Sequence, residues 1–279
     1  MRPFSLRAPA SLRLAALLSI LAACDGRSPA AGGGSPSVPV SSSSAPASSP
    51  APASSPAPAS SPAPAIAVEH LEIVTGGADA RDPLPMIVAI HGLGDRPESL
   101  LAALRGFDRP ARLIAPRGIE PFSDGYSWFP LRGALSSEEV GRGILRAADA
   151  LAALLRRLAA ERPTQGKPIV TGFSQGGALT LALATRHPEG VGAAFPIGGW
   201  IPLSLAPSSV TGLPPIVALH GEADPRVAIG PTREAIAALA ARGARAELVA
   251  YPGVGHTITA EMRRDLERLI REALARSRE

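Results

Sequence analysis

The sequence contains one cysteine, one lysine and few aromatic residues. Cys24 is the only cysteine among 279 residues, which excludes an intramolecular disulfide and a zinc site made of several cysteines. Lys167 is the only lysine, so arginine supplies nearly all of the positive charge, and the net charge of +4 is modest. Pairs such as Arg156-Arg157 and Arg263-Arg264 alternate with acidic residues and lack aromatic neighbours. This pattern is typical of solvated helix faces, and we expect no nucleic-acid partner.

The longest apolar run near the N-terminus, from 14 to 23, is about half of the roughly 20 residues that a membrane-spanning helix needs. Three arginines and no acidic residue precede it, which is the layout of a signal peptide. The run closes with Leu21-Ala22-Ala23-Cys24, which resembles the lipobox of bacterial lipoproteins. The resemblance implies a signal peptide over 1–23 and lipidation of Cys24 with more than one acyl chain, which anchors stably. An ordinary secretory signal with an incidental cysteine is the alternative.

A low-complexity segment follows the cysteine. From 26 to 65 the chain consists mostly of Ala, Ser, Pro and Gly, and Ala-Ser-Ser-Pro-Ala-Pro occurs three times between Ala47 and Pro64. Such a composition cannot bury a core, and about 40 extended residues reach on the order of 100 Å. We predict a disordered tether over 24–65, with a proline-rich ligand for a partner domain as the alternative, and one folded domain over 66–279.

Short apolar runs alternate with longer helical patterns throughout 66–279. This alternation predicts the α/β class, with a mostly parallel sheet flanked by helices on both faces. The expected strands lie at 68–74, 86–90, 112–115, 169–171, 193–196, 216–219 and 247–251. The expected helices lie at 97–104, 138–160, 176–187, 231–242 and 259–275.

A Gly-x-Ser-x-Gly pattern stands at Gly172-Phe173-Ser174-Gln175-Gly176, between a predicted buried strand and a predicted helix. A strand-to-helix turn that presents a serine hydroxyl is so tight that the flanking residues must lack bulk, which explains the glycines. The turn also places the hydroxyl near a helix N-terminus. The context therefore indicates that Ser174 is a nucleophile.

A serine hydroxyl needs a base that accepts its proton, and the base needs an orienting carboxylate. Serine nucleophiles on such sheets are followed in the chain by the acid and then by the base. His256 is the one histidine late in the chain, and we assign it as the base. The loop 219–224 offers Glu222 and Asp224, of which we favour Asp224. Structural roles are expected for the other histidines, which are His70, His91, His187 and His220.

The attacked carbonyl also needs two N–H donors for its oxyanion. One donor should follow the nucleophile, at Gln175. The other should come from the loop after an early strand, where Ile90-His91-Gly92-Leu93-Gly94-Asp95 stands. The glycines of this loop let the backbone approach a substrate, and we assign Leu93 as the second donor.

Four motifs together resemble the phospholipase/carboxylesterase family, which includes acyl-protein thioesterases. They are His91-Gly92-Leu93-Gly94-Asp95, Gly172-Phe173-Ser174-Gln175-Gly176-Gly177, His220-Gly221 with Asp224 and Val227, and Gly255-His256. The resemblance covers about residues 85 to 275 and implies an α/β-hydrolase fold without metal or organic cofactor. It implies hydrolysis of carboxylic esters or thioesters through an acyl-enzyme. It carries catalytic roles over to Ser174, Asp224 and His256, and oxyanion roles to Leu93 and Gln175.

Two features bear on the substrate. Trp128 resembles the aromatic loop near the acyl pocket of that family, and a core tryptophan is an equally good interpretation. Lids in this fold are usually inserted before the strand at 216, but only 197–214 lies there. We therefore expect no large lid and an open site, which favours small or exposed acyl groups.

The sequence thus predicts a serine carboxylesterase that acts on a small-molecule ester. We expect it to be exported and lipid-anchored to a bacterial membrane, in the periplasm or at the cell surface. The alternatives are an exported polyester or feruloyl-ester depolymerase, and a non-catalytic binding lipoprotein.

Overall fold

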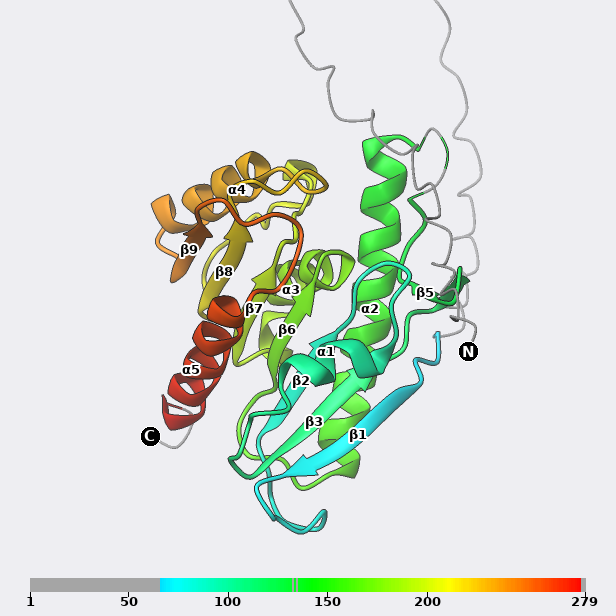
Figure 1. Ribbon diagram of the computed structural model, residues 1–279, viewed down its shortest axis with the longest axis vertical. Helices are drawn as coiled ribbons and strands as arrows, with labels where there is room; N and C mark the ends of the chain where they lie inside the picture. Colours follow the sequence, from blue (N-terminus) through cyan, green and yellow to red (C-terminus); the bar gives the residue numbers. More distant parts are fainter. Residues whose placement is uncertain (1–65, 132, 134, 277–279) are drawn as a thin grey trace, which may run out of the picture. The chain divides into compact units, whose positions relative to one another are not determined.

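The computed structural model describes residues 66–131, 133 and 135–276 (Figure 1). The predicted signal peptide, Cys24 and the predicted tether lie outside the described residues. Within the part of the chain that is described, no helix has the length and apolar character needed to cross a membrane.

The described chain is built on a seven-stranded sheet with the order β1-β3-β2-β6-β7-β8-β9. Strand β1 is antiparallel to β3, and every other neighbouring pair is parallel. The strands are β1 (His70–Thr75), β2 (Met86–Ile90), β3 (Ala111–Pro116), β6 (Ile169–Phe173), β7 (Ala193–Ile197), β8 (Ile216–Gly221) and β9 (Ala246–Tyr251). The predicted fold class, a mostly parallel sheet flanked by helices, is confirmed.

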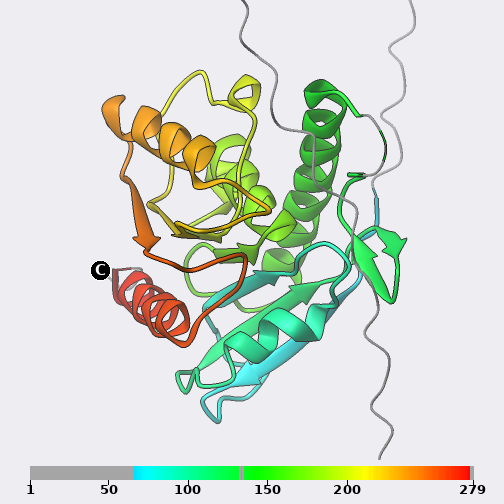
Figure 2. The same cartoon turned by 45° about the horizontal axis from the view of Figure 1, so that its top comes forward.

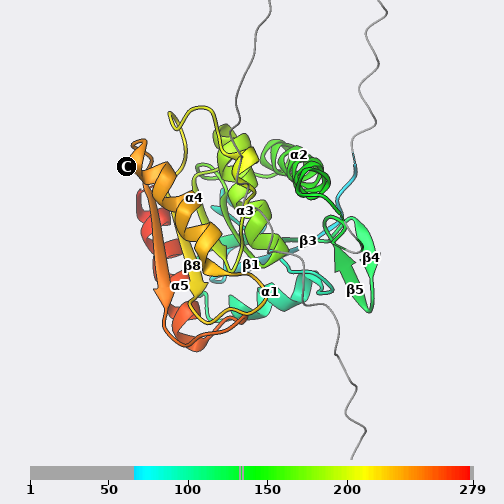
Figure 3. The ribbon, with the colours of Figure 1, turned by 90° about the horizontal axis from the view of Figure 1, so that it is seen from above.

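Helices cover both faces of the sheet (Figure 3). One face carries α2 (Ser137–Glu161), α3 (Gln175–Arg186) and α4 (Ile229–Ala241), and the other carries α1 (Pro97–Ala103) and α5 (Ala260–Arg276). Successive side chains of a strand point to opposite faces. In β2, accordingly, Met86, Val88 and Ile90 join the core under the first helix layer, whereas Ile87 and Ala89 join the other core. A strand buried on both faces reads as a continuous apolar run, which explains why the strands could be predicted.

The ends of all seven predicted strands and all five predicted helices lie within two residues of the observed ends. The long helix α2 begins at a capping box, in which the Ser136 hydroxyl accepts the Glu139 N–H and the Glu139 carboxylate accepts the Ser136 N–H. These bonds satisfy N–H groups that the first turn of a helix leaves unpaired.

A two-stranded hairpin beside the main sheet was not among the predicted elements. It comprises β4 (Glu120–Phe122) and β5 (Gly125–Ser127) and stands at the right of Figure 2. Strands of three residues are too short to show an alternating pattern. The structure also contains two short 3-10 helices, η1 (Pro188–Gly190) and η2 (Leu203–Leu205).

The parallel strands bring four loops to one edge of the sheet, because their carboxyl ends point the same way. The loops after β2, β6, β8 and β9 carry Leu93, Ser174, Asp224 and His256, respectively. Between β7 and β8 the only described helix or strand is η2, which agrees with the expectation of no large lid.

Candidate active site

Ser174 occupies the sharp turn between β6 and α3. Its backbone has φ 57° and ψ −114°, a region that is strained for a residue with a side chain. The turn is held by the Ser174 N–H, which donates to the carbonyl of Ile197 at 2.9 Å. A Cβ on Gly172 would lie 2.3 Å from the Gly176 oxygen, and a Cβ on Gly176 would lie 1.9 Å from the Ile90 oxygen. Both glycines are therefore required by close packing around the serine.

Ser174, His256 and Asp224 form one hydrogen-bonded chain. The Nε2 atom of His256 lies 3.0 Å from the Ser174 hydroxyl oxygen. Its Nδ1 atom lies 2.7 Å from Oδ2 of Asp224. The side chains of His256 and Asp224 are 9% and 1% exposed, so both are shielded from water, whereas Ser174 is half-buried. This arrangement lets the imidazole accept a proton from the serine hydroxyl.

The other oxygen of Asp224 is bound by its own loop. Oδ1 accepts the N–H groups of Arg226 and Val227, each at 2.9 Å. Burial by itself raises the pKa of Asp224, but the N–H of Val227, the contact with His256 and the N–H of Arg226 outweigh it and hold the pKa below its usual value. Asp224 is therefore ionised at neutral pH, as an acceptor for the His256 Nδ1–H must be.

Glu222, the alternative carboxylate of this loop, does not reach the histidine. It is exposed and contacts Arg233 at 3.4 Å on the surface. Of the two acids in the loop, the structure brings Asp224 to His256.

Two backbone N–H groups beside the serine are available to a ligand. A Cβ built on Gly92 would lie 3.4 Å from the Cβ of Ser174, so the loop after β2 passes directly over the nucleophile. Within the described part of the chain, neither the N–H of Leu93 nor that of Gln175 makes a hydrogen bond. These are the two groups that the sequence predicts as oxyanion donors.

Comparisons with known proteins identify the family of this chain. A profile of the phospholipase/carboxylesterase family matches residues 69–274. The chain belongs to the phospholipase/carboxylesterase family. The resemblance, the fold and the enzyme class expected from the sequence, a carboxylesterase-type hydrolase, are thereby confirmed.

Relatives and a solved structure of this kind cover most of the described chain. The probable carboxylesterase SOBER1-like of Arabidopsis thaliana is 30% identical in an alignment 213 residues long, and the match covers 68% of this chain and 79% of that protein. Acyl-protein thioesterase 1 of Gibberella zeae is 22% identical in an alignment 211 residues long, and the match covers 67% of this chain and 90% of that protein. The crystal structure of esterase PE8 is similar with a TM-score of 0.65 at 25% identity, covering 75% of this chain and 100% of that one.

Trp128 is fully buried in this member of the carboxylesterase family. Its indole N–H donates to the carbonyl of His91 at 2.9 Å, and its backbone N–H donates to the side chain of Gln175 at 3.0 Å. The Gln175 side chain is buried too and donates to the carbonyl of Phe129 at 2.8 Å. The core interpretation of Trp128 is thus the one that agrees with the structure, and the side chain offers no surface to a substrate.

Two histidines that were given structural roles lie directly against the site. His220 is fully buried, bonds the Val227 carbonyl through Nε2 at 2.9 Å and lies 3.6 Å from Oδ2 of Asp224. His91 is fully buried beside the loop that carries Leu93. His91 directly follows β2 and His220 is the penultimate residue of β8. Each therefore stands next to a loop that carries a predicted site residue, and this position in the sequence could have identified them.

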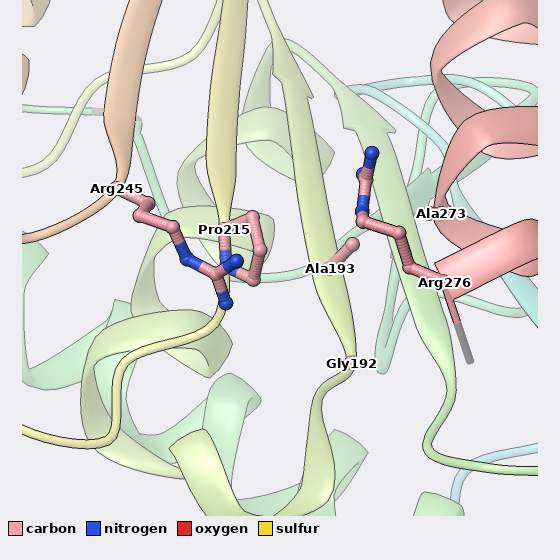
Figure 4. A pocket seen from close by; sticks show the side chains of 6 residues that line it. All are labelled: Gly192, Ala193, Pro215, Arg245, Ala273 and Arg276. Atoms are coloured by element: carbon pink, nitrogen blue, oxygen red, sulfur yellow. The ribbon is translucent and has the colours of Figure 1, made fainter. Parts of the chain in front are cut away.

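The candidate site around Ser174 is separate from the hollow shown in Figure 4. That hollow, of about 240 Å³, is lined by Gly192, Ala193, Pro215, Arg245, Ala273 and Arg276. It lies where β7 and β8 begin, whereas Ser174 stands where the strands end. Among the described residues no group of three or more His, Cys, Asp or Glu side chains is arranged to hold a metal ion.

Proposed function

We propose that the chain is a serine carboxylesterase in which Ser174 is the nucleophile. The hydrogen-bonded chain from Ser174 through His256 to Asp224 is the observation that supports this proposal. The Ser174 oxygen bonds to the ester carbonyl carbon while its proton passes to Nε2 of His256. The tetrahedral intermediate then collapses, the bond to the leaving alcohol breaks, and His256 gives the proton to that alcohol.

Water completes the cycle by the same route. It loses a proton to His256, attacks the acyl-enzyme, and releases the carboxylic acid as the proton returns to Ser174. The N–H groups of Leu93 and Gln175 would stabilise the oxyanion in both halves. Asp224 keeps the Nδ1–H tautomer of His256 in place and stabilises the imidazolium as it forms.

The proposed substrate class rests on the family and on the short segment between β7 and β8. We propose a small-molecule carboxylic ester, and the relative named as an acyl-protein thioesterase makes a thioester a second candidate. Assays with soluble esters, an acyl-thiocholine, a polyester film and a feruloyl ester would separate these substrates. The short segment between β7 and β8 favours acyl groups that are small or exposed.

Labelling with a fluorophosphonate tests the nucleophile. We expect the full chain to be labelled and Ser174→Ala to remove both the label and the hydrolysis of p-nitrophenyl acetate. Ser137→Ala is the matched control, because Ser137 is an exposed serine in the first turn of α2. Equal labelling of the wild type and Ser174→Ala would show that the nucleophile is another residue.

We also propose export and anchoring through a lipid on Cys24, on the basis of the sequence motif. In a bacterial host we expect the wild type in the membrane fraction and Cys24→Ser in a soluble fraction, with metabolic labelling by a fatty acid lost in the variant. Equal membrane association of both would contradict the anchor and leave the esterase proposal untouched.

A further inference from the structure

The peptide group between Gly92 and Leu93 is bound through its carbonyl oxygen. Nδ1 of His91 lies 2.7 Å from this oxygen, and the N–H of Asp95 also donates to it at 3.3 Å. In a trans peptide the C=O and the following N–H point in opposite directions, and the described residues contain no cis peptide bond. The group that holds the Gly92 carbonyl therefore also sets the direction of the Leu93 N–H.

The hydrogen bonds of His91 determine which ring nitrogen carries the proton. The N–H of Gly118, which can only donate, points to Nε2 at 3.0 Å. Nε2 must then be the unprotonated nitrogen, so the neutral ring carries its proton on Nδ1 and donates it to the Gly92 carbonyl. Burial lowers the pKa of His91 and keeps the ring neutral at pH 7, against the opposing effects of its hydrogen bond to the Gly92 carbonyl and of the charges of Asp95 and Glu98.

The backbone on both sides of this peptide is anchored independently. On one side, the carbonyl of His91 accepts the indole N–H of Trp128 at 2.9 Å. On the other, the Gly94 N–H donates to the Tyr126 carbonyl at 2.8 Å, and the Tyr126 N–H donates to the Asp95 carbonyl at 3.0 Å. With its flanks held, the remaining freedom is rotation of the peptide itself, and glycine at 92 offers little resistance to such a flip.

We infer that His91 is a positioning residue that holds the Gly92–Leu93 peptide with the Leu93 N–H turned toward the oxyanion of the substrate. This inference rests on the proposed function, because it assumes that Ser174 attacks a carbonyl. A flipped peptide would present the Gly92 oxygen to the oxyanion and would remove one of the two donors. The cost would fall on the transition state and not on ground-state binding of the ester.

Two substitutions separate the two hydrogen bonds of the ring. His91→Asn keeps a donor near the position of Nδ1 and loses the acceptor at Nε2. His91→Gln keeps an acceptor near the position of Nε2 and loses the donor to Gly92. Loss of one oxyanion donor lowers kcat by about 100- to 1,000-fold in enzymes of this kind. We therefore expect His91→Gln to lose at least about tenfold in kcat with KM little changed, and His91→Asn to lose clearly less.

The same assay distinguishes failure of this inference from failure of the proposed function. If Ser174→Ala retains hydrolysis, the proposed nucleophile is wrong. If Ser174→Ala is inactive but folded His91→Gln keeps the wild-type kcat, or both His91 variants lose kcat equally, the positioning role is wrong and the nucleophile stands. Thermal unfolding of each variant identifies those that fold.

A measurement on the wild type decides the matter if the buried substitutions prevent folding. Two-bond 1H–15N correlation spectra of the 15N-histidine-labelled protein report the tautomer of each of the five histidines. We expect His91 to be neutral with the proton on Nδ1. A proton on Nε2 would leave Gly92 without its donor and would overturn the inference.

Discussion

The ring of Phe173 lies beside the ring of His256, with 4.7 Å between the ring centres and an angle of 35° between their planes. On the same part of the site is Gly198, where an added Cβ would lie 3.7 Å from His256 and 3.4 Å from Phe173. The base is thus held in position by packing as well as by its hydrogen bond to Asp224. An aromatic ring beside an imidazole also favours the charged imidazolium that forms during catalysis.

Phe173 should therefore increase kcat by packing against His256, although its ring takes no part in proton transfer. Contacts between aromatic rings are worth about 0.5–1.5 kcal/mol, so Phe173→Leu should lower kcat by roughly 2- to 10-fold. Phe173→Tyr keeps the ring and should stay near the wild-type kcat. Steady-state kinetics on p-nitrophenyl acetate measure both variants, and equal losses would show that the ring itself is not what matters.

Asp224→Asn removes the charge that faces His256 and nearly preserves the shape of the side chain. The amide cannot hold the imidazole in the required tautomer or stabilise its charged form, so we expect kcat to fall by about 1,000- to 10,000-fold. Glu222→Gln changes the exposed carboxylate of the same loop and should leave kcat within about twofold of the wild type. A larger loss for Glu222→Gln than for Asp224→Asn would reverse the assignment of the acid.

Glu72 should link stability to pH. Burial by itself raises the pKa of Glu72, but hydrogen bonds and charge from Arg112 and Arg162 outweigh it and lower the pKa from its ordinary value of 4.5. The folded state thus keeps the carboxylate ionised at pH values where the unfolded chain binds a proton. The stabilisation is complete above about pH 4.5 and is lost as the pH falls through the lower folded-state pKa.

Urea unfolding of Glu72→Gln at several pH values tests this linkage. At pH 7 we expect the variant to be less stable by about 1.5–3 kcal/mol, because Arg112 is fully buried and loses a charged partner. The difference from the wild type should shrink as the pH falls below 4.5. Glu69→Gln is the control, since Glu69 pairs with Arg117 at the surface and should change stability by less than about 1 kcal/mol. If the stability difference between the wild type and Glu72→Gln grew as the pH fell, the predicted direction of the pH dependence would be wrong.

The substitution Trp128→Phe distinguishes a structural role of Trp128 in the core from a role in an acyl pocket. The substitution leaves the carbonyl of His91 without the indole donor, and we expect a loss of about 2 kcal/mol in the free energy of unfolding. Trp200→Phe serves as the comparison, because Trp200 is only partly buried and packs edge-on against Phe129. Unchanged stability together with an altered preference for acyl length in Trp128→Phe would instead support the pocket interpretation.

The short segment between β7 and β8 predicts the chain-length preference. For p-nitrophenyl esters from acetate to palmitate, we expect kcat/KM to be highest for the short acyl chains, because a site without a large lid has little apolar surface to enclose a long one. A clear optimum at the long chains would show that other loops build a deep acyl channel.

Most of the fold was predictable because its central strands are buried on both faces. A run such as 86–90 is apolar at every position, and the Gly-x-Ser-x-Gly pattern marks a turn in which Gly172 and Gly176 are packed against backbone. The hairpin at 120–127 was not predictable, since strands of three residues show no periodicity.

The choice of acid and the roles of the histidines depend on orientation, which spacing does not encode. Glu222 and Asp224 stand two residues apart in one loop, and only the path of the backbone brings Asp224 to His256. His91 and His220 occupy similar places near strand ends, but their ring nitrogens meet different groups. Nε2 of His91 accepts the N–H of Gly118, whereas Nε2 of His220 faces the carbonyl oxygen of Val227.

The strained backbone conformation of Ser174 lowers the stability of the domain at the position of the proposed nucleophile. Glycine adopts φ 57° and ψ −114° with less strain than serine does. The strained conformation of Ser174 persists because β6, α3 and the hydrogen bond to the Ile197 carbonyl hold the turn. Ser174→Gly is therefore expected to raise the free energy of unfolding and to remove the hydroxyl that attacks the ester in the proposed mechanism. The strained turn at Ser174 therefore costs the domain stability and supplies the hydroxyl that the proposed mechanism needs.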